Sequence, residues 1–188
     1  DYYGNEDFFK AYPNDDRKEW NYMTEWKIKS GEIIPYTESA DKLPAISKYY
    51  DYDEGAPGKS AQSNGITCIY RYAEVLLMYA EASTRATNSV NQDALNAIQE
   101  VQKRAGYQNR QIELTTTTEP AAFLTAVSNE RGWEFFAEMK RWFELVRLEK
   151  VSEVRAETWN GSLFQSNNHY YFPIPYQQIR LTQWTNNA

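Results

Sequence analysis

The stretch from Glu130 to Arg147, ERGWEFFAEMKRWFELVR, constrains the fold most, because acidic and aromatic residues recur in it at helical spacing. On a helix, Glu130, Glu134 and Glu138 lie four residues apart along one stripe, which Arg141 continues. A neighbouring stripe is apolar and consists of Phe135, Met139, Trp142 and either Leu145 or Val146. The sequence therefore predicts one helical region that carries a row of carboxylates beside an apolar face.

The carboxylate row is open to two interpretations. Two carboxyl groups roughly 5–10 Å apart across a cleft can act as the acids of a glycoside hydrolase. Alternatively, arginines can hold the carboxylates through paired hydrogen bonds in a structural network, and they would then keep them ionised, the wrong state for a general acid. We expect the network, with Arg71 and Glu74 also forming an i, i+3 pair. Its predicted members are Arg71, Glu74, Glu130, Arg131, Glu134, Glu138 and Arg141, with Arg147 as a further partner for the carboxylates.

Helical periodicity begins upstream of this stretch. A first helix has one apolar face, formed by Ile69, Tyr72, Ala73, Leu76, Leu77 and Ala80. Asn91 is a suitable N-cap for a second helix, which Gly106 would end, and its apolar positions are Ala94, Ala97, Ile98, Val101 and Ala105. A third helix, capped by Thr117 or Thr118, leads into the central stretch. Small residues on the facing sides favour close antiparallel packing, so we predict a mainly α fold with tetratricopeptide-like helical hairpins.

The 188 residues suit one domain with three regions. Residues 1–65 lack sustained periodicity and contain many prolines and glycines, which predicts a loop-rich cap. Residues 66–150 are predicted to form a helical core. Residues 151–188 are predicted to form a C-terminal loop and an extended segment, because the residues before Pro173 and Pro175 avoid the helical region.

Composition excludes several classes of function. The formal net charge of −6 and a pI of about 5.0 argue against nucleic acid and against an anionic membrane surface. No run of apolar residues is long enough to span a bilayer. Cys68 is the single cysteine, and its apolar neighbours predict a buried, unreactive thiol. Asp51, Asp53 and Glu54 offer oxygens to calcium but lack EF-hand spacing, so we expect no metal and no cofactor.

Two of the predicted helices are apolar on more than one side. Val75, Met78 and Tyr79 lie away from the stripe of Leu77, and Phe136 and Phe143 lie away from Phe135. A helix in a small isolated domain usually has one buried stripe and one polar face. We therefore expect a second packing layer, and we expect the isolated chain to expose a contiguous apolar patch.

Four motifs in the same order resemble the SusD/RagB family of surface nutrient-binding lipoproteins of Bacteroidetes-type outer membranes. The first is Asn14-Asp15-Asp16-Arg17, which is similar to the D-P-R entry of the family. The second is RYAEVLLMYAEA, residues 71–82. The third is the central stretch described above. The fourth is Phe172-Pro173-Ile174-Pro175, followed by Gln178-Ile179.

This resemblance implies a C-terminal portion of a glycan-binding subunit that has no covalent chemistry. The subunit would capture an oligosaccharide and pass it to a SusC-like TonB-dependent transporter in polysaccharide utilization. The resemblance also implies that the N-terminal half of the family, with its export signal and lipid anchor, lies outside this chain, and that the protein is anchored at the cell surface. Two alternatives stay open: a hydrolase that uses the helix carboxylates, and a helical-repeat scaffold that binds proteins and no small ligand.

Sugar binding requires aromatic faces beside hydrogen-bonding side chains. Two clusters offer this mixture. One lies in the predicted cap and consists of Trp20, Asn21, Tyr22 and Trp26. The other lies in the predicted C-terminal loop and is led by Trp159 and Asn160, followed by Asn167, Asn168, His169 and Tyr170.

Overall fold

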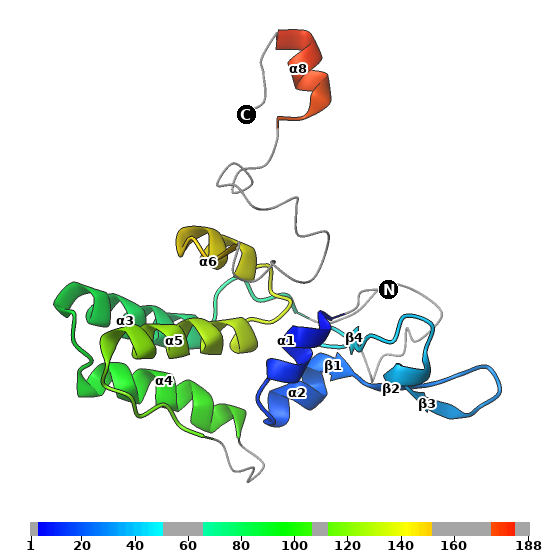
Figure 1. The fold of residues 1–188 in the computed structure, drawn as a ribbon, viewed down its shortest axis with the longest axis horizontal. Coiled ribbons are helices and arrows are strands. Elements are labelled where there is room, and N and C mark those ends of the chain that lie inside the picture. Colours follow the sequence, from blue (N-terminus) through cyan, green and yellow to red (C-terminus); the bar gives the residue numbers. More distant parts are fainter. Residues whose placement is uncertain (1–3, 51–65, 107–112, 152–173, 183–188) are drawn as a thin grey trace. The chain divides into compact units, whose positions relative to one another are not determined.

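The computed structural model describes residues 4–50, 66–106, 113–151 and 174–182 (Figure 1). These residues fall into two compact units, one that ends at Glu138 and one that begins at Met139. Helices dominate the described residues, as predicted, and the strands there are only two or three residues long. Among the described residues, no helix is both long enough and apolar enough to cross a membrane.

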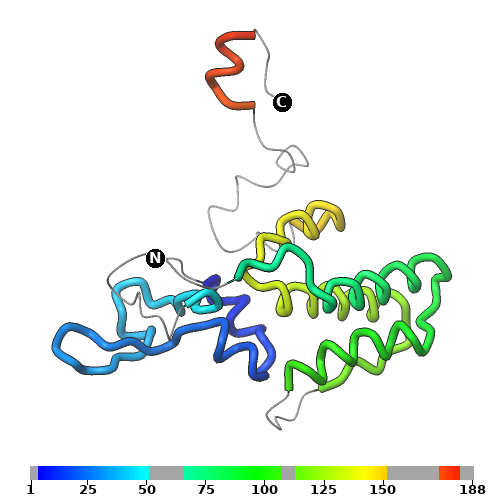
Figure 2. Tube along the Cα trace, turned by 180° about the vertical axis from the view of Figure 1, so that it is seen from behind, coloured from blue at the N-terminus to red at the C-terminus, as the bar shows by residue number. Residues whose placement is uncertain are grey.

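Three helices form the core of the first unit: α3 (Tyr72–Thr87), α4 (Gln92–Ala105) and α5 (Pro120–Glu134). Helix α3 packs against both α4 and α5, and α4 also contacts α5 (Figure 2). Their shared core is apolar and contains Leu77, Ala80, Ala94, Leu95, Ala97, Ile98, Val101, Phe123, Val127 and Phe135. The alanines on α3 and α4 let these two helices approach closely, so the predicted helical hairpin is confirmed.

Local signals explain where the core helices begin and end. Asn88 ends α3 in the left-handed conformation with φ 48°, which asparagine tolerates better than most residues. Asn91 caps α4 as predicted, since its Oδ1 accepts a hydrogen bond of 2.7 Å from the amide of Ala94. Helix α4 ends at Gly106, also as predicted. The N-cap residue of α5 is Glu119 rather than Thr117 or Thr118. The Glu119 carboxylate accepts hydrogen bonds from the first two backbone amides after Pro120.

The N-terminal part of the first unit is a small cap of short elements. It comprises α1 (Glu6–Ala11), α2 (Asp16–Asn21), β1 (Tyr22–Met23), β2 (Glu25–Lys27), β3 (Ile33–Pro35), the 3-10 turn η1 (Tyr36–Glu38) and β4 (Ala45–Ile46). Strand β1 pairs antiparallel with β4, and β2 pairs antiparallel with β3. The predicted loop-rich character therefore holds for the described residues 4–50, which also carry two two-stranded ribbons.

Aromatic rings join this cap to the end of α5. Phe136 stacks on Phe8 at a centroid distance of 5.9 Å and contacts Tyr22 at 4.6 Å. Tyr12 meets Tyr22 edge-on at 5.7 Å, and its hydroxyl donates a 2.6 Å hydrogen bond to the carbonyl of Trp133. The second apolar side predicted at Phe136 is thus covered by the cap.

The central stretch is not one helix, and this part of the prediction is wrong. Helix α5 ends at Glu134, and α6 (Arg141–Arg147) begins only after a tight turn. Ala137 and Met139 have φ values of 60° and 59°, a left-handed conformation that a right-handed helix cannot contain. The predicted apolar stripe is split as a result, because Phe135 is buried in the core whereas Met139 is exposed.

The second unit contains α6 and α8 (Tyr176–Thr182) among its described residues. On α6, Glu144 and Leu145 are buried and Phe143 is exposed. Arg141 Nη1 lies 3.2 Å from Glu144 Oε2, a pair within one turn of the helix. Helix α8 has no buried residue.

Two predictions about residues 66–72 are also wrong. Cys68 is exposed rather than buried. The helix begins at Tyr72, so Ile69 belongs to the irregular segment before it and is exposed, and Tyr72 itself lies on the outer side of the helix. The buried face of α3 is therefore narrower than the predicted apolar face. The helical spacing of apolar residues does not extend to the residues before Tyr72. The exposure of Cys68 shows that apolar neighbours in the sequence do not by themselves bury a side chain.

Candidate functional site

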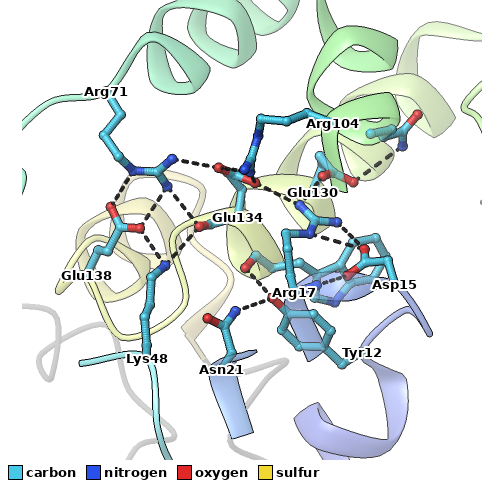
Figure 3. Close-up of polar contacts among 12 residues, drawn as sticks. Tyr12, Asp15, Arg17, Asn21, Lys48, Arg71, Arg104, Glu130, Glu134 and Glu138 are labelled. Atoms are coloured by element: carbon cyan, nitrogen blue, oxygen red, sulfur yellow. Dashed lines mark hydrogen bonds and ion pairs between the residues drawn. The ribbon is translucent and has the colours of Figure 1, made fainter. Parts of the chain in front are cut away.

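Glu134, at the C-terminal end of α5, is the centre of a buried network of charges (Figure 3). Arg71 Nη1 donates to its Oε1 at 2.7 Å, and Arg17 Nη1 donates to its Oε2 at 2.9 Å. Arg104 Nη2 lies 2.7 Å from both carboxylate oxygens. Burial chiefly disfavours this carboxylate, and the partial negative charge of a helix C-terminus acts in the same direction, so the three guanidinium groups offset both effects.

Arg17 extends the network to Glu130 and to the cap. Its Nη1 donates to Glu130 Oε1 at 2.6 Å, and its Nη2 donates to Asp15 Oδ2 at 2.6 Å. Asp15 Oδ1 in turn accepts the backbone amide of Arg17 at 3.0 Å, so the same aspartate caps α2. One arginine thereby connects α2 to two successive turns of α5.

Glu138 closes the network on the other side, after the end of α5. It accepts hydrogen bonds from Arg71 Nη2 and from Lys48 Nζ at 2.7 and 2.6 Å. The same two cations also donate to the backbone carbonyl of Glu134, at 2.9 and 3.2 Å. Lys48 follows β4 and Arg71 directly precedes α3. Their hydrogen bonds therefore hold the segment after β4 and the start of α3 against the end of α5.

The network is electrically balanced. The four carboxylates of Asp15, Glu130, Glu134 and Glu138 lie against four cations, Arg17, Lys48, Arg71 and Arg104. All four carboxylate side chains are buried, with exposed fractions of 1–5%. Breaking a buried pair of this kind leaves an uncompensated charge, which costs several kcal/mol.

The ionisation of the two central glutamates follows from these contacts. Burial by itself raises the pKa of Glu134, but the hydrogen bond from Arg71 and the charges of Arg104 and Arg17 outweigh it, so the pKa lies below its ordinary value of 4.5. Burial dominates at Glu130, and its pKa is raised above 4.5 despite the charge of Arg17. Glu134 is therefore held as a carboxylate in the interior.

Among the predicted members of the network, the structure brings Arg71 together with Glu134 and Glu138. Arg131 Nη2 lies 3.9 Å from Glu74, and Arg141 belongs to the second unit, where it pairs with Glu144. Arg71 reaches Glu134 at the end of α5. The cations that the sequence analysis missed are Arg17, Lys48 and Arg104, and of these only Arg17 stood in a recognised motif.

Asn21 and Tyr22, two of the predicted ligand contacts, lie in the interior. Asn21 is 5% exposed, and its Nδ2 donates to the hydroxyl of Tyr12 at 2.7 Å. Tyr22 is 3% exposed and packs against Phe9 and Phe136. Burial also raises the pKa of Tyr12 far above its ordinary range, so its phenol stays protonated as the donor to Trp133. Both predicted residues support the cap and are not accessible to a ligand.

Trp20 and Trp26 remain on the surface of the cap. Trp20 lies on α2 and is 61% exposed. Its backbone carbonyl accepts a 2.9 Å hydrogen bond from the Ser47 hydroxyl. Trp26 is half-buried on β2, opposite Ile34. The predicted C-terminal cluster lies outside the described residues; its members are Trp159, Asn160, Asn167, Asn168, His169 and Tyr170. The residues considered as calcium ligands also lie outside them, namely Asp51, Asp53 and Glu54. Within the described residues, no group of three or more His, Cys, Asp and Glu side chains is arranged to hold a metal.

The SusD family profile matches residues 3–185, which is nearly the whole sequence. This chain belongs to the SusD family. The resemblance seen in the four sequence motifs is thereby confirmed. Among curated SusD-family proteins, SusD-like protein P2 of Formosa agariphila is 29% identical over 185 aligned residues, and SusD-like protein P25 of the same organism is 27% identical over 144.

Solved SusD-family structures share the fold. A SusD superfamily protein from Parabacteroides distasonis is 25% identical with a TM-score of 0.73, and the match covers 99% of this chain and 41% of that protein. The surface glycan-binding protein A of Bacteroides uniformis is 25% identical with a TM-score of 0.65, covering 97% of this chain and 40% of that protein. The expected tetratricopeptide-like helical architecture is confirmed by these neighbours.

The chain spans only about a third of the length of the curated relatives that it matches. The matches cover 88% and 74% of this chain but only 36% and 26% of the two Formosa agariphila proteins. The network around Glu134 lies within residues 3–185, which the family profile matches.

Proposed function

We propose that this chain is part of a glycan-binding component of an outer-membrane polysaccharide uptake system. The observation that carries this proposal is the family match over nearly the whole chain, in a family that includes a surface glycan-binding protein of similar fold. The buried network supports it, because the acidic residues most suited to catalysis are committed to holding the fold together. The protein would bind sugar without cutting it.

A glycoside hydrolase is the weaker alternative. Such an enzyme needs one protonated carboxyl group and a second carboxylate on opposite sides of a sugar. Glu134 is ionised by three guanidinium groups, and both Glu130 and Glu134 are almost completely buried. These glutamates therefore lack the access to a sugar that hydrolysis requires, and their carboxylates already lie against arginines.

The glycan contacts that we propose within the described residues are Trp20 and Trp26. An exposed indole offers an apolar face to the C–H groups of a sugar ring. The backbone at Trp20 is also anchored, because Arg17 and Asn21 hold α2 on either side of it. Less conformational entropy is lost when a ligand binds to an element that is already ordered. Trp159 and Asn160 remain proposed contacts in the C-terminal region.

The proposed partner in uptake is a TonB-dependent outer-membrane transporter that receives the oligosaccharide. We propose that the protein acts at the cell surface, held there by a lipid anchor. A pull-down of the lipid-anchored protein from detergent-solubilised outer membranes tests this assignment. Recovery of a TonB-dependent transporter with it supports the assignment, and recovery of the protein from the soluble fraction alone contradicts it.

Glycan binding is tested by screening the folded protein against a glycan array and then by calorimetry with the best oligosaccharide. Reducing-sugar release is measured in parallel. Binding without release supports the proposal, binding with release favours the hydrolase, and protein partners without any glycan favour the scaffold.

In the same assay, Trp20→Ala is expected to weaken binding about tenfold, since stacking of this kind is worth about 1–2 kcal/mol. Phe143→Ala, an exposed aromatic on α6, is the control and should leave affinity unchanged.

A further inference from the structure

The turn between α5 and α6 has a conformation that its own residues do not favour. Residues 135–140 read FFAEMK, a stretch without glycine or proline in which the last four residues are among the strongest helix formers. Ala137 and Met139 nevertheless adopt the left-handed conformation, with φ values of 60° and 59°. A side chain makes this conformation unfavourable, so contacts from outside the turn must hold it.

Those contacts come from Lys48 and Arg71, which together with Glu138 we call the latch (Figure 3). Glu138 Oε1 accepts hydrogen bonds from Lys48 Nζ at 2.6 Å and from Arg71 Nη2 at 2.7 Å, and its Oε2 accepts one from Arg71 Nε at 3.1 Å. The Glu138 side chain is 5% exposed, although the next residue, Met139, is 89% exposed. One buried carboxylate thus ties the turn to two segments that are distant in the sequence.

The latch also replaces the hydrogen bond that would continue α5. In an uninterrupted helix, the carbonyl of Glu134 accepts the amide of residue 138. Here the amide of Glu138 donates to the carbonyl of Phe135 at 3.0 Å. The Glu134 carbonyl instead accepts Arg71 Nη2 at 2.9 Å and Lys48 Nζ at 3.2 Å. The two cations therefore cap the C-terminus of α5, where positive charge is favourable.

Lys48 connects the latch directly to the cap. The preceding residue, Ser47, donates its hydroxyl to the carbonyl of Trp20 at 2.9 Å and its amide to the carbonyl of Asn21 at 3.0 Å. Trp20 and Asn21 are the last two residues of α2. Two adjacent residues thus hold the end of α2 and the turn after α5, so a displacement of α2 acts on the latch through a single peptide bond.

We propose that the latch is a conformational switch. When it is closed, α5 ends at Glu134, as observed. When it is open, residues 135–140 adopt the helical conformation that their sequence favours, and α5 and α6 become one helix. A switch requires an element with two discrete arrangements, and this turn has them because the latch and the local helix propensity oppose each other. The switch requires no bound glycan, so it is testable in the free protein.

The test opens the latch without unbalancing the network. The double variant Lys48→Gln/Glu138→Ala removes one cation and one carboxylate, and it leaves Arg71 bonded to the carboxylate of Glu134. Nuclear magnetic resonance then measures the three-bond coupling between the amide and α protons of residues 137 and 139, which reports φ. We expect both couplings to fall to helical values. Amide exchange of residues 139 and 140 should become about tenfold slower or more, because helical hydrogen bonds form.

A matched control and a rescue accompany this variant. Glu6→Ala/Lys10→Gln removes an exposed ion pair from α1 and should change neither the couplings nor the exchange rates in the turn. Adding Ala137→Gly and Met139→Gly to the variant without the latch should restore the native exchange rates. Glycine adopts a positive φ without steric cost and disfavours a helix, so it holds the turn in place of the latch.

Two results would overturn the proposal. Left-handed couplings that persist without the latch would show that another contact, such as the stacking of Phe136 on Phe8, holds the turn. Averaged couplings with fast exchange would show that the open state is disordered rather than helical. Lys48→Gln alone decides the question if the double variant does not fold. Its couplings should move part of the way towards helical values, and unchanged couplings would contradict the switch.

Discussion

Glu134 is the residue whose environment explains the most about this protein. It is the last residue of α5 and accepts hydrogen bonds from arginines that precede α3 and that lie on α2 and α4. Its carboxylate is therefore the point where the three core helices and the cap are joined. A buried carboxylate with three guanidinium partners is expected to act in stability, and its charge is unavailable for acid–base chemistry.

Replacing Glu134 with glutamine should lower the free energy of unfolding by about 2–4 kcal/mol, because the largely buried Arg17, the partly buried Arg71 and the exposed Arg104 then lose a shared, buried counter-charge. Denaturant unfolding followed by circular dichroism measures this change. The control is Glu6→Gln, since Glu6 forms an exposed pair with Lys10, and its effect should stay below about 0.5 kcal/mol. Unchanged stability combined with lost glycan binding would show that Glu134 is a functional residue instead.

The stability difference between the native protein and Glu134→Gln should depend on pH. The pKa of Glu134 is lower in the folded state than its ordinary value of 4.5, so its contribution is complete above 4.5 and is lost as pH falls through the folded value. Glu130 acts in the opposite direction, because its raised pKa makes the folded state less stable as pH rises through 4.5. Unfolding curves from neutral pH to below 4.5 should show the two proteins converging, and a constant difference would contradict this assignment.

At the level of elements, hydrogen bonds from Arg17 are the chief connection between α2 and α5. The short helix has only six residues and is too short to be stable by itself. Arg17 joins it to Glu130 and Glu134, and the hydrogen bond from Asn21 to Tyr12 joins it to the aromatic layer. This explains why an Asp-Asp-Arg motif far from the central stretch belongs to the same site.

Arg17→Gln should therefore release the cap before it disturbs the helices. Removing one partner of this buried network is expected to cost about 3–5 kcal/mol. Hydrogen exchange should become faster in α1, α2 and β1, while the central amides of α3, α4 and α5 remain the most protected. Lys10→Gln, which removes an exposed cation of α1, is the control. Uniform acceleration across α3–α5 would show that the cap and the helices unfold as one unit.

At the level of the whole molecule, the described residues combine a shared helical core with exposed apolar side chains. The helices α3, α4 and α5 share the core, whereas α3 and the cap each expose large apolar side chains. The chain covers about two fifths of the solved SusD-family structures that it matches.

Far-ultraviolet circular dichroism of the chain should show a spectrum dominated by helix, because the described strands contain only two or three residues each. Thermal unfolding of the ordered helices should abolish most of that signal. A spectrum dominated by strand would contradict both the structure and the family assignment.

The sequence by itself determined α3, α4 and the family. Apolar spacing and Asn91 define α3 and α4 because a helix depends on neighbours three and four residues away, which the sequence displays directly. The row of Glu130, Glu134 and Glu138 was visible for the same reason, because its members are four residues apart. The four motifs, which recur in order along the chain, were sufficient to place the protein in the SusD family.

Only the tertiary structure decided which cations those carboxylates bind. Arg17, Lys48 and Arg104 lie between 30 and 117 positions away from the glutamates that they contact, and no local pattern encodes such distances. The end of α5 at Glu134 was equally hidden, since Phe135 to Lys140 continue the helical pattern while the chain turns through a left-handed conformation. Long-range charge pairing and packing against the cap oppose local helix propensity there, and propensity is too weak to prevail.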